Sequence, residues 1–142
     1  MYLNIDKSAI FIADSHYNSN RTELLNVLQS IQSKKIKTNQ IFLMGDNFDF
    51  LCDGITYFIE QNKEVIDFIN DLSVTKEIIY LEGNHDFNLS TLFPNVLVIS
   101  RDFQPLICEY ENKKIALSHG DIFMNKSYEI FTSIVRSKAT AF

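Results

Sequence analysis

The sequence of 142 residues predicts one α/β domain built on a parallel sheet. Short, β-prone apolar runs alternate with longer segments in which apolar residues recur every three or four positions. This alternation is typical of strands joined by crossover helices. The composition is 46% hydrophobic and 22% charged, as in ordinary globular proteins, and a chain of this length can bury a core of its own.

The first half of the chain alternates between the two kinds of segment. Residues 9–13 are continuously apolar, which indicates a strand covered on both faces. Leu24, Leu28 and Ile31 recur at helical spacing and predict an amphipathic helix around them. The predicted strands are residues 9–13, 40–44 and 77–81, and the predicted helices are residues 21–34 and 57–72.

The second half of the chain has a different pattern. Strand candidates follow one another without a helix between them, and Glu111-Asn112-Lys113 has the composition of a hairpin turn joining the last two. A final helix is predicted further on, with Tyr128, Phe131, Ile134 and Val135 on one face. The predicted strands are residues 96–99, 106–110 and 113–118, and the predicted helix is residues 126–135.

Charge and cysteine content narrow the class of protein. The net charge of −5 and the lack of a basic stripe argue against nucleic-acid binding. Cys52 and Cys108 form no C-x-x-C pattern, so we expect reduced thiols in the core or in a pocket wall. Asp6 and Lys7 interrupt the first apolar residues, and no apolar run approaches the length of about 18 residues that spans a membrane. We therefore expect a soluble cytoplasmic protein, with peripheral contact at the inner membrane left open.

Four polar clusters each follow a predicted strand. Alone, each could be a helix cap, a turn or a loop. The carboxyl ends of parallel strands share one edge of a sheet, so clusters far apart in sequence are expected to converge there. Aspartate, histidine and asparagine are donors that suit divalent Mn, Fe or Zn, so the combination predicts a metal centre. The clusters are Asp14-Ser15-His16, Gly45-Asp46-Asn47-Phe48-Asp49, Gly83-Asn84-His85-Asp86 and His119-Gly120-Asp121.

The order D-x-H, G-D-x-x-D, G-N-H-D and H-G resembles that of the calcineurin-like metallophosphoesterase superfamily, over essentially the whole chain. The resemblance implies an α/β/β/α sandwich and two divalent metal ions, Mn in the first instance, with Fe or Zn as alternatives. Asp14 and His16 would bind the first metal and Asp46 would bridge both. Asn84 and His119 would bind the second.

The resemblance also implies a reaction, the hydrolysis of a phosphodiester or pyrophosphate bond by a metal-bound hydroxide. His85 would protonate the leaving oxygen, and Asp86 would orient the His85 ring. Asp49 would be a partner of the ligands and not a ligand itself. The neutral amide of Asn84 would supply an oxygen without adding charge that repels phosphate.

One motif of the superfamily has no counterpart here. The G-H-x-H motif supplies one further histidine to each metal, but the only histidines are His16, His85 and His119. We therefore expect residues 1–142 to form the N-terminal two-thirds of a metallophosphoesterase domain, incomplete at its C-terminus. Each metal would then keep three protein ligands at most.

A narrower resemblance is to bacterial UDP-2,3-diacylglucosamine pyrophosphatases of lipid A synthesis, on residues 44–50, 83–87 and 119–121. Their best-known branch has arginine at the position of His85, which leaves a related branch or another phosphodiesterase open. Arg136 would contact a substrate phosphate, with a solvated helix end as the alternative. Apolar residues near the motifs could line a pocket for acyl chains, although packing in the core under the loops is favoured. These are Phe48, Phe50, Leu51, Phe87, Ile122, Phe123 and Met124.

The implied partner is a phosphate-ester small molecule or a nucleotide-linked lipid. Two other classes remain, a noncatalytic scaffold for protein binding and a protein phosphatase, because a fold does not fix a function. Scaffolds of this kind usually lose ligands or the catalytic histidine, whereas His85 and the ligands of the first four motifs are present. The short loops disfavour a protein phosphatase.

Overall fold

Residues 2–123 are described by the computed structural model, and their two larger sheets pack face to face. The first sheet has the strand order β2-β3-β5-β7, with every pair parallel. The second has the order β1-β8-β9, in which β1 is parallel to β8 and β8 is antiparallel to β9. The strands are β1 (Leu3–Asn4), β2 (Ile10–Ile12), β3 (Gln40–Leu43), β5 (Glu77–Leu81), β7 (Leu97–Ile99), β8 (Leu106–Tyr110) and β9 (Lys113–Leu117).

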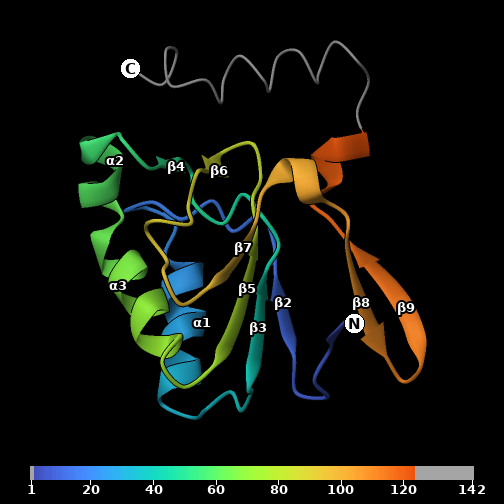
Figure 1. The fold of residues 1–142 in the computed structure, drawn as a ribbon. Coiled ribbons are helices and arrows are strands. Elements are labelled where there is room, and N and C mark those ends of the chain that lie inside the picture. The colour runs from blue at the N-terminus through green and yellow to red at the C-terminus, as the bar shows by residue number, and fades with distance from the viewer. Residues whose placement is uncertain (1, 124–142) are drawn as a thin grey trace.

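Helices cover the outer face of the first sheet. Figure 1 shows α1 (Glu23–Gln32) and α3 (Lys63–Leu72) on one side of this sheet and the β8–β9 hairpin on the other. The helices, the first sheet and the second sheet form three layers of the predicted α/β/β/α sandwich. The predicted helix at residues 126–135 lies outside the described residues. Two short 3-10 helices, η1 (Arg101–Phe103) and η2 (Gly120–Phe123), complete the described elements.

The predicted helix at residues 57–72 is corrected to two helices, α2 (Thr56–Gln61) and α3. The division falls at Asn62, which is buried. Its side-chain Nδ2 donates to the carbonyl oxygens of Phe50 at 3.0 Å and Phe58 at 2.8 Å. An asparagine side chain that bonds nearby carbonyls competes with regular helix, which is a physical reason for the break here.

Alternating side chains bury both faces of the central strands. In β3, Ile41 and Leu43 belong to the core under the helices, and Phe42 belongs to the core between the sheets. Cys108 lies in the core between the sheets and Cys52 is also buried, as predicted for these thiols. The continuous apolar runs predicted as strands therefore pack on two sides. In β5, Ile78 and Tyr80 face the helices and Ile79 and Leu81 face the second sheet.

The hairpin turn was correctly predicted. Tyr110 of β8 pairs with Lys113 of β9, leaving Glu111 and Asn112 as a two-residue loop. Both loop residues have positive φ, +49° and +64°. This is the backbone twist that tight hairpins prefer.

Two short strands escaped prediction. Strands β4 (Leu51–Cys52) and β6 (Asp86–Phe87) pair in parallel, and Leu51 N–H also donates to the carbonyl of His85 at 2.9 Å. Strands of two residues carry no periodicity that a sequence could reveal. Their pairing joins the loop after β3 to the loop after β5, which places two of the polar clusters side by side. Within residues 2–123, no helix has the length and apolar character needed to cross a bilayer.

Candidate metal centre

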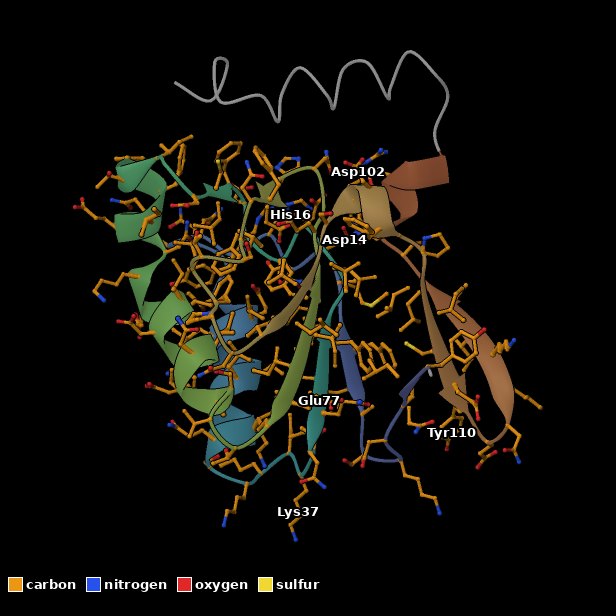
Figure 2. All side chains as sticks on the ribbon, viewed as in Figure 1. Asp14, His16, Lys37, Glu77, Asp102 and Tyr110 are labelled. Atoms are coloured by element: carbon orange, nitrogen blue, oxygen red, sulfur yellow. The ribbon has the colours of Figure 1, made fainter. Side chains whose placement is uncertain are left out.

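The polar clusters converge as predicted, at one end of the molecule. Asp14 follows β2, Asp46 follows β3 and Asn84 follows β5, while His119 arrives from β9 of the second sheet. Figure 2 shows Asp14 and His16 at the end of the molecule opposite Glu77. The centre is therefore built where the carboxyl ends of parallel strands meet the second sheet.

The carboxylate of Asp46 lies at the middle of the cluster and is 5% exposed. Its Oδ1 accepts a hydrogen bond from the backbone N–H of His85 at 2.8 Å, and its Oδ2 lies 3.3 Å from Nε2 of His119. With the Asn84 amide turned to donate, its nitrogen lies 2.7 Å from Oδ2 and 3.1 Å from Oδ1. Ligand atoms of Asp14, His16 and Asp46 also lie within 4.8 Å of one another. The other four predicted ligands are thus close to the carboxylate of Asp46.

Three of these ligands have left-handed backbone conformations, which are uncommon for residues with side chains. Their φ angles are +53° at Asp14, +42° at His16 and +51° at Asp46. Hydrogen bonds between the loops hold them, from Asp14 N–H to the carbonyl of Gly45 at 3.1 Å and from His16 N–H to that of Asp46 at 3.0 Å. Such conformations cost free energy and cluster at functional sites.

Two glycines allow the loops to approach each other. A Cβ at Gly83 would lie 2.2 Å from Oδ1 of Asp46 and 2.6 Å from its backbone nitrogen. A Cβ at Gly45 would lie 2.6 Å from Nδ1 of His119, and Gly45 has a φ of +95°. Any side chain at either position would displace a predicted ligand.

The predicted role of Asp86 needs correction. Its buried carboxylate does not orient the ring of His85 but accepts hydrogen bonds from the two loops and from the core. Neighbouring residues in extended backbone point in opposite directions, so Asp86, which begins β6, turns inward while His85 turns outward. Its donors are the backbone N–H groups of Asp46 (2.8 Å), Asn47 (2.8 Å) and Gly83 (2.9 Å) and the hydroxyl of Tyr80.

The ring of His85 is held by Asp49. Nδ1 of His85 lies 2.8 Å from the carbonyl oxygen of Asp49. The Asp49 carboxylate is 3.9 Å from Nδ1 of His16. The rings of His16 and His85 pack edge to face, with their centroids 5.1 Å apart. One ligand atom from each of these three residues lies within 4.8 Å of the others. Asp49 therefore contacts both histidines, and its carboxylate offers a candidate ligand atom in this group.

Burial and charge act together on the ionisable groups. Burial raises the pKa of Asp86 to about 6, although its hydrogen bonds oppose the change. Burial lowers the pKa of His119, but the hydrogen bond and charge of Asp46 outweigh it and raise that pKa to about 9. Burial raises the pKa of Asp46, and its contacts with His119 and His85 more than offset this and lower it. A buried carboxylate that faces one protonated histidine is an environment that suits a metal cation, which would replace the His119 proton.

Gln104 is a supporting residue that sequence reasoning missed. Its Oε1 accepts a hydrogen bond from the backbone N–H of His119 at 2.7 Å. Its Nε2 donates to the carbonyls of Glu82 at 2.8 Å and Ile99 at 3.3 Å. Gln104 thus fastens the loop that carries His119 to the end of the first sheet. It belongs to no motif, so the sequence alone carried no signal for this role.

We expect Gln104→Ala to lower the free energy of unfolding by about 2 kcal/mol and to weaken metal binding. The variant removes the acceptor of the His119 N–H and one donor to the carbonyl of Glu82, and it thereby releases the His119 loop. Urea denaturation with and without Mn²⁺ measures both effects. Gln29→Ala, on an exposed position of α1, is the control, and equal losses in the two variants would contradict the proposed role of Gln104.

Tyr80→Phe is expected to destabilise the fold by about 1.5 to 3 kcal/mol, the range for a hydrogen bond to a charged group. The Tyr80 hydroxyl is fully buried and donates to the carboxylate of Asp86. Thermal unfolding of the variant checks the value. Tyr57→Phe removes a hydroxyl from a ring that is 63% exposed and is expected to have little effect.

The structure describes some of the residues predicted to line an acyl pocket or contact substrate, and it leaves others undescribed. Phe48, Leu51 and Phe87 are fully buried, which confirms core packing over an acyl pocket for these three. Phe50 is half-buried and lines a pocket. Arg136 lies outside the described residues, as does Met124, and the side chains of Ile122 and Phe123 are not described, so those predictions stand untested.

Comparisons with known proteins identify the family of this chain. The family model for calcineurin-like phosphoesterases matches residues 8–140, so the chain belongs to that family. It is 26% identical over 118 residues to a UDP-2,3-diacylglucosamine hydrolase of Coxiella burnetii, covering 81% of this chain and 47% of that protein. It is 27% identical over 136 residues to the enzyme of that name from Aromatoleum aromaticum, covering 93% of this chain and 55% of the other.

A solved structure supports the same fold. The nuclease MPE of Pseudomonas putida aligns with a TM-score of 0.50 and 18% identity, over 72% of this chain and 51% of that one. The chain spans about half the length of the curated relatives described above, 47% and 55%. Membership of the family implies divalent metal ions, and the carboxylate, imidazole and amide donors around Asp46 fit them.

Proposed function

We propose that this chain carries the catalytic centre of a divalent-metal-dependent hydrolase that cleaves a phosphodiester or pyrophosphate bond. The supporting observation is the position of Asp46, whose carboxylate lies within contact of Asn84 and His119 and within ligand distance of Asp14 and His16. When bound, a pair of such ions activates the water nucleophile and neutralises charge on the phosphate. Manganese is the metal we propose first, with iron or zinc as alternatives.

The protein groups divide the remaining tasks. Asp14 and His16 would hold the first ion, Asn84 and His119 the second, and Asp46 would contact both. The carbonyl of Asp49 accepts a hydrogen bond from Nδ1–H of His85. In its imidazolium form the ring would keep this proton and give the one on Nε2 to the leaving oxygen.

The substrate that we propose is UDP-2,3-diacylglucosamine, cleaved at its pyrophosphate bond in lipid A synthesis. Support comes from the relatives of that name, which match this chain at 26% and 27% identity. Such a lipid-linked nucleotide would bring the enzyme into peripheral contact with the cytoplasmic face of the inner membrane. A noncatalytic scaffold is the rival that experiment must exclude.

Turnover separates these two functions. The chain is incubated with Mn²⁺ and the p-nitrophenyl ester of methyl phosphate, and release of p-nitrophenolate is followed. Hydrolysis that disappears with a chelator and returns with Mn²⁺ supports the enzyme. A rise in thermal stability with Mn²⁺ but no turnover would instead favour the scaffold.

The leaving group tests the proposed role of His85. With a phenyl ester of methyl phosphate, His85→Gln is expected to lower kcat about a hundredfold or more, because phenolate needs a proton as it leaves. With the p-nitrophenyl ester the loss should be only a few-fold, because that leaving group is a weak base. Equal losses on both esters would show that His85 does not act as the acid.

A further inference from the structure

A pocket adjoins the metal centre and is not used by the chemistry above. Its volume is about 220 Å³, and its walls include Tyr17, Asp49, Phe50, Tyr57 and Phe58. It lies between the polar loops and α2. Asp49 belongs to both sites, since its carbonyl contacts His85 at 2.8 Å and its carboxylate lies 3.9 Å from His16. A ligand in this pocket would therefore extend from a phosphate held at the centre.

The apolar walls of the pocket are aromatic rings that hold one another in place. The centroids of Phe50 and Phe58 are 4.7 Å apart, and those of Tyr57 and Phe58 are 5.1 Å apart. Phe50 also meets Phe87 edge to face at 5.8 Å, which anchors it to the core. Tyr57 is 63% exposed, although a ring of its size gains free energy by burial. Fixed aromatic rings with accessible faces are stacking surfaces for flat ligands.

Polar groups complete the walls. Asn18, Asp49 and Gln61 also line the pocket. Nδ2 of Asn18 donates to the Asp49 carboxylate at 3.3 Å, which fixes both groups at the side of the metal centre. Aromatic faces beside amide and carboxylate groups suit a flat ring with hydrogen-bonding edges better than they suit an alkyl chain.

The size of the pocket indicates whether it suits the nucleobase or the acyl chains of a nucleotide-linked lipid. Sites for drug-sized ligands have volumes of about 300 to 1,000 Å³. A volume of about 220 Å³ is smaller than this range and matches one ring-sized group better than a pair of acyl chains.

We propose that this pocket binds the nucleobase of a nucleotide substrate whose phosphate lies at the metal centre, with Tyr57 stacking on the base. The proposal rests on the proposed phosphoesterase function and adds a specificity site to it. It makes Tyr57 a residue that selects the substrate and takes no part in bond cleavage.

Two substrates with the same scissile bond test this site. One is the β-methyl ester of uridine 5′-diphosphate and the other is the β-methyl ester of ribose 5-diphosphate, which lacks only the base. The chain with Mn²⁺ is expected to hydrolyse the uridine compound with about tenfold higher kcat/KM, chiefly through a lower KM, as stacking of one base allows. Tyr57→Ala should bring the ratio of the two kcat/KM values toward one, and Tyr57→Phe should preserve it.

Phe103→Ala is the matched control. Phe103 lies on η1 and is 78% exposed. It is not one of the described residues that line this pocket. The ratio should be unchanged in this variant. Equal kcat/KM for the two substrates in the parent chain, or a preference that survives Tyr57→Ala, would overturn the nucleobase site while leaving the proposed hydrolase intact.

Binding of uridine alone separates failure of the site from failure of the reaction. If neither diphosphate is hydrolysed, the proposed function fails, and ligand-observed NMR with uridine then decides the question of the pocket. Saturation transfer to the base protons that is lost in Tyr57→Ala supports the pocket. No transfer in the parent chain overturns it.

Discussion

Asp46→Asn is expected to abolish metal-dependent hydrolysis and metal-induced stabilisation together. The substitution keeps the shape of the side chain and an oxygen that can accept the His85 N–H, but removes the charge at the middle of the centre. Removing one electrostatic donor from an active site costs up to about 10³-fold in rate, and we expect at least this loss here. The parent chain should gain about 2.7 kcal/mol of stability at a Mn²⁺ concentration one hundred times Kd, and the variant should gain none.

Asp67→Asn is the matched control for charge. Asp67 lies on α3 and pairs with Lys63 at 2.7 Å on an exposed face, so its loss should change neither readout. Rates are measured with the p-nitrophenyl ester, and stability by thermal unfolding over a series of Mn²⁺ concentrations. An Asp46→Asn chain that is still stabilised by Mn²⁺ and still active would refute the assignment of Asp46 as a ligand of both metals.

Gly83→Ala is expected to have the next largest effect. The added Cβ would lie 2.2 Å from Oδ1 of Asp46 and 2.6 Å from its backbone nitrogen. Rotation of a side chain cannot relieve contact with the backbone, so the two loops must separate. Overpacking of this kind costs about 1 to 3 kcal/mol, and we expect the upper end of that range. A catalytic group displaced by about 1 Å can lose a hundredfold in rate, so hydrolysis should fall by about that factor.

Gly120→Ala provides the comparison. No atom of the described residues lies within 4 Å of a Cβ built at Gly120. Its effect on stability should therefore stay within about 0.5 kcal/mol. Urea denaturation of both variants measures the difference. If the two alanine variants lose the same stability, the close approach of Gly83 to Asp46 does not limit what this position accepts.

The fold and the meeting of the polar clusters at one end of the molecule could be predicted because both depend on local sequence order. Apolar runs such as residues 40–44 define strands, and a cluster such as Gly83-Asn84-His85-Asp86 can be recognised directly after its strand. Parallel sheets then bring strand ends together without any further information. The other four predicted ligands lie around Asp46 for this reason.

The contacts that hold the ligands could not be predicted, because their partners are distant in sequence. Asp86 was assigned to its neighbour His85, yet two of its donors are the N–H groups of Asp46 and Asn47, which lie 40 and 39 positions away. The same holds for Gln104, which reaches His119 across 15 positions from a segment with no motif. Periodicity and motif order do not predict contacts between residues this far apart in sequence, because the folded backbone determines them.

The origin of His119 in the second sheet has a consequence for the molecule as a whole. An ion held by Asp46 of one sheet and His119 of the other would act as a further cross-link between two layers that already share an apolar core and the Gln104 hydrogen bonds. Packing of the two sheets and binding of the ion are then coupled. By thermodynamic necessity, the coupling free energy is the same whether it is measured as tighter packing or as tighter ion binding. Any change that draws the β8–β9 hairpin away from the first sheet weakens ion binding by the same amount that the ion strengthens the attachment of the hairpin.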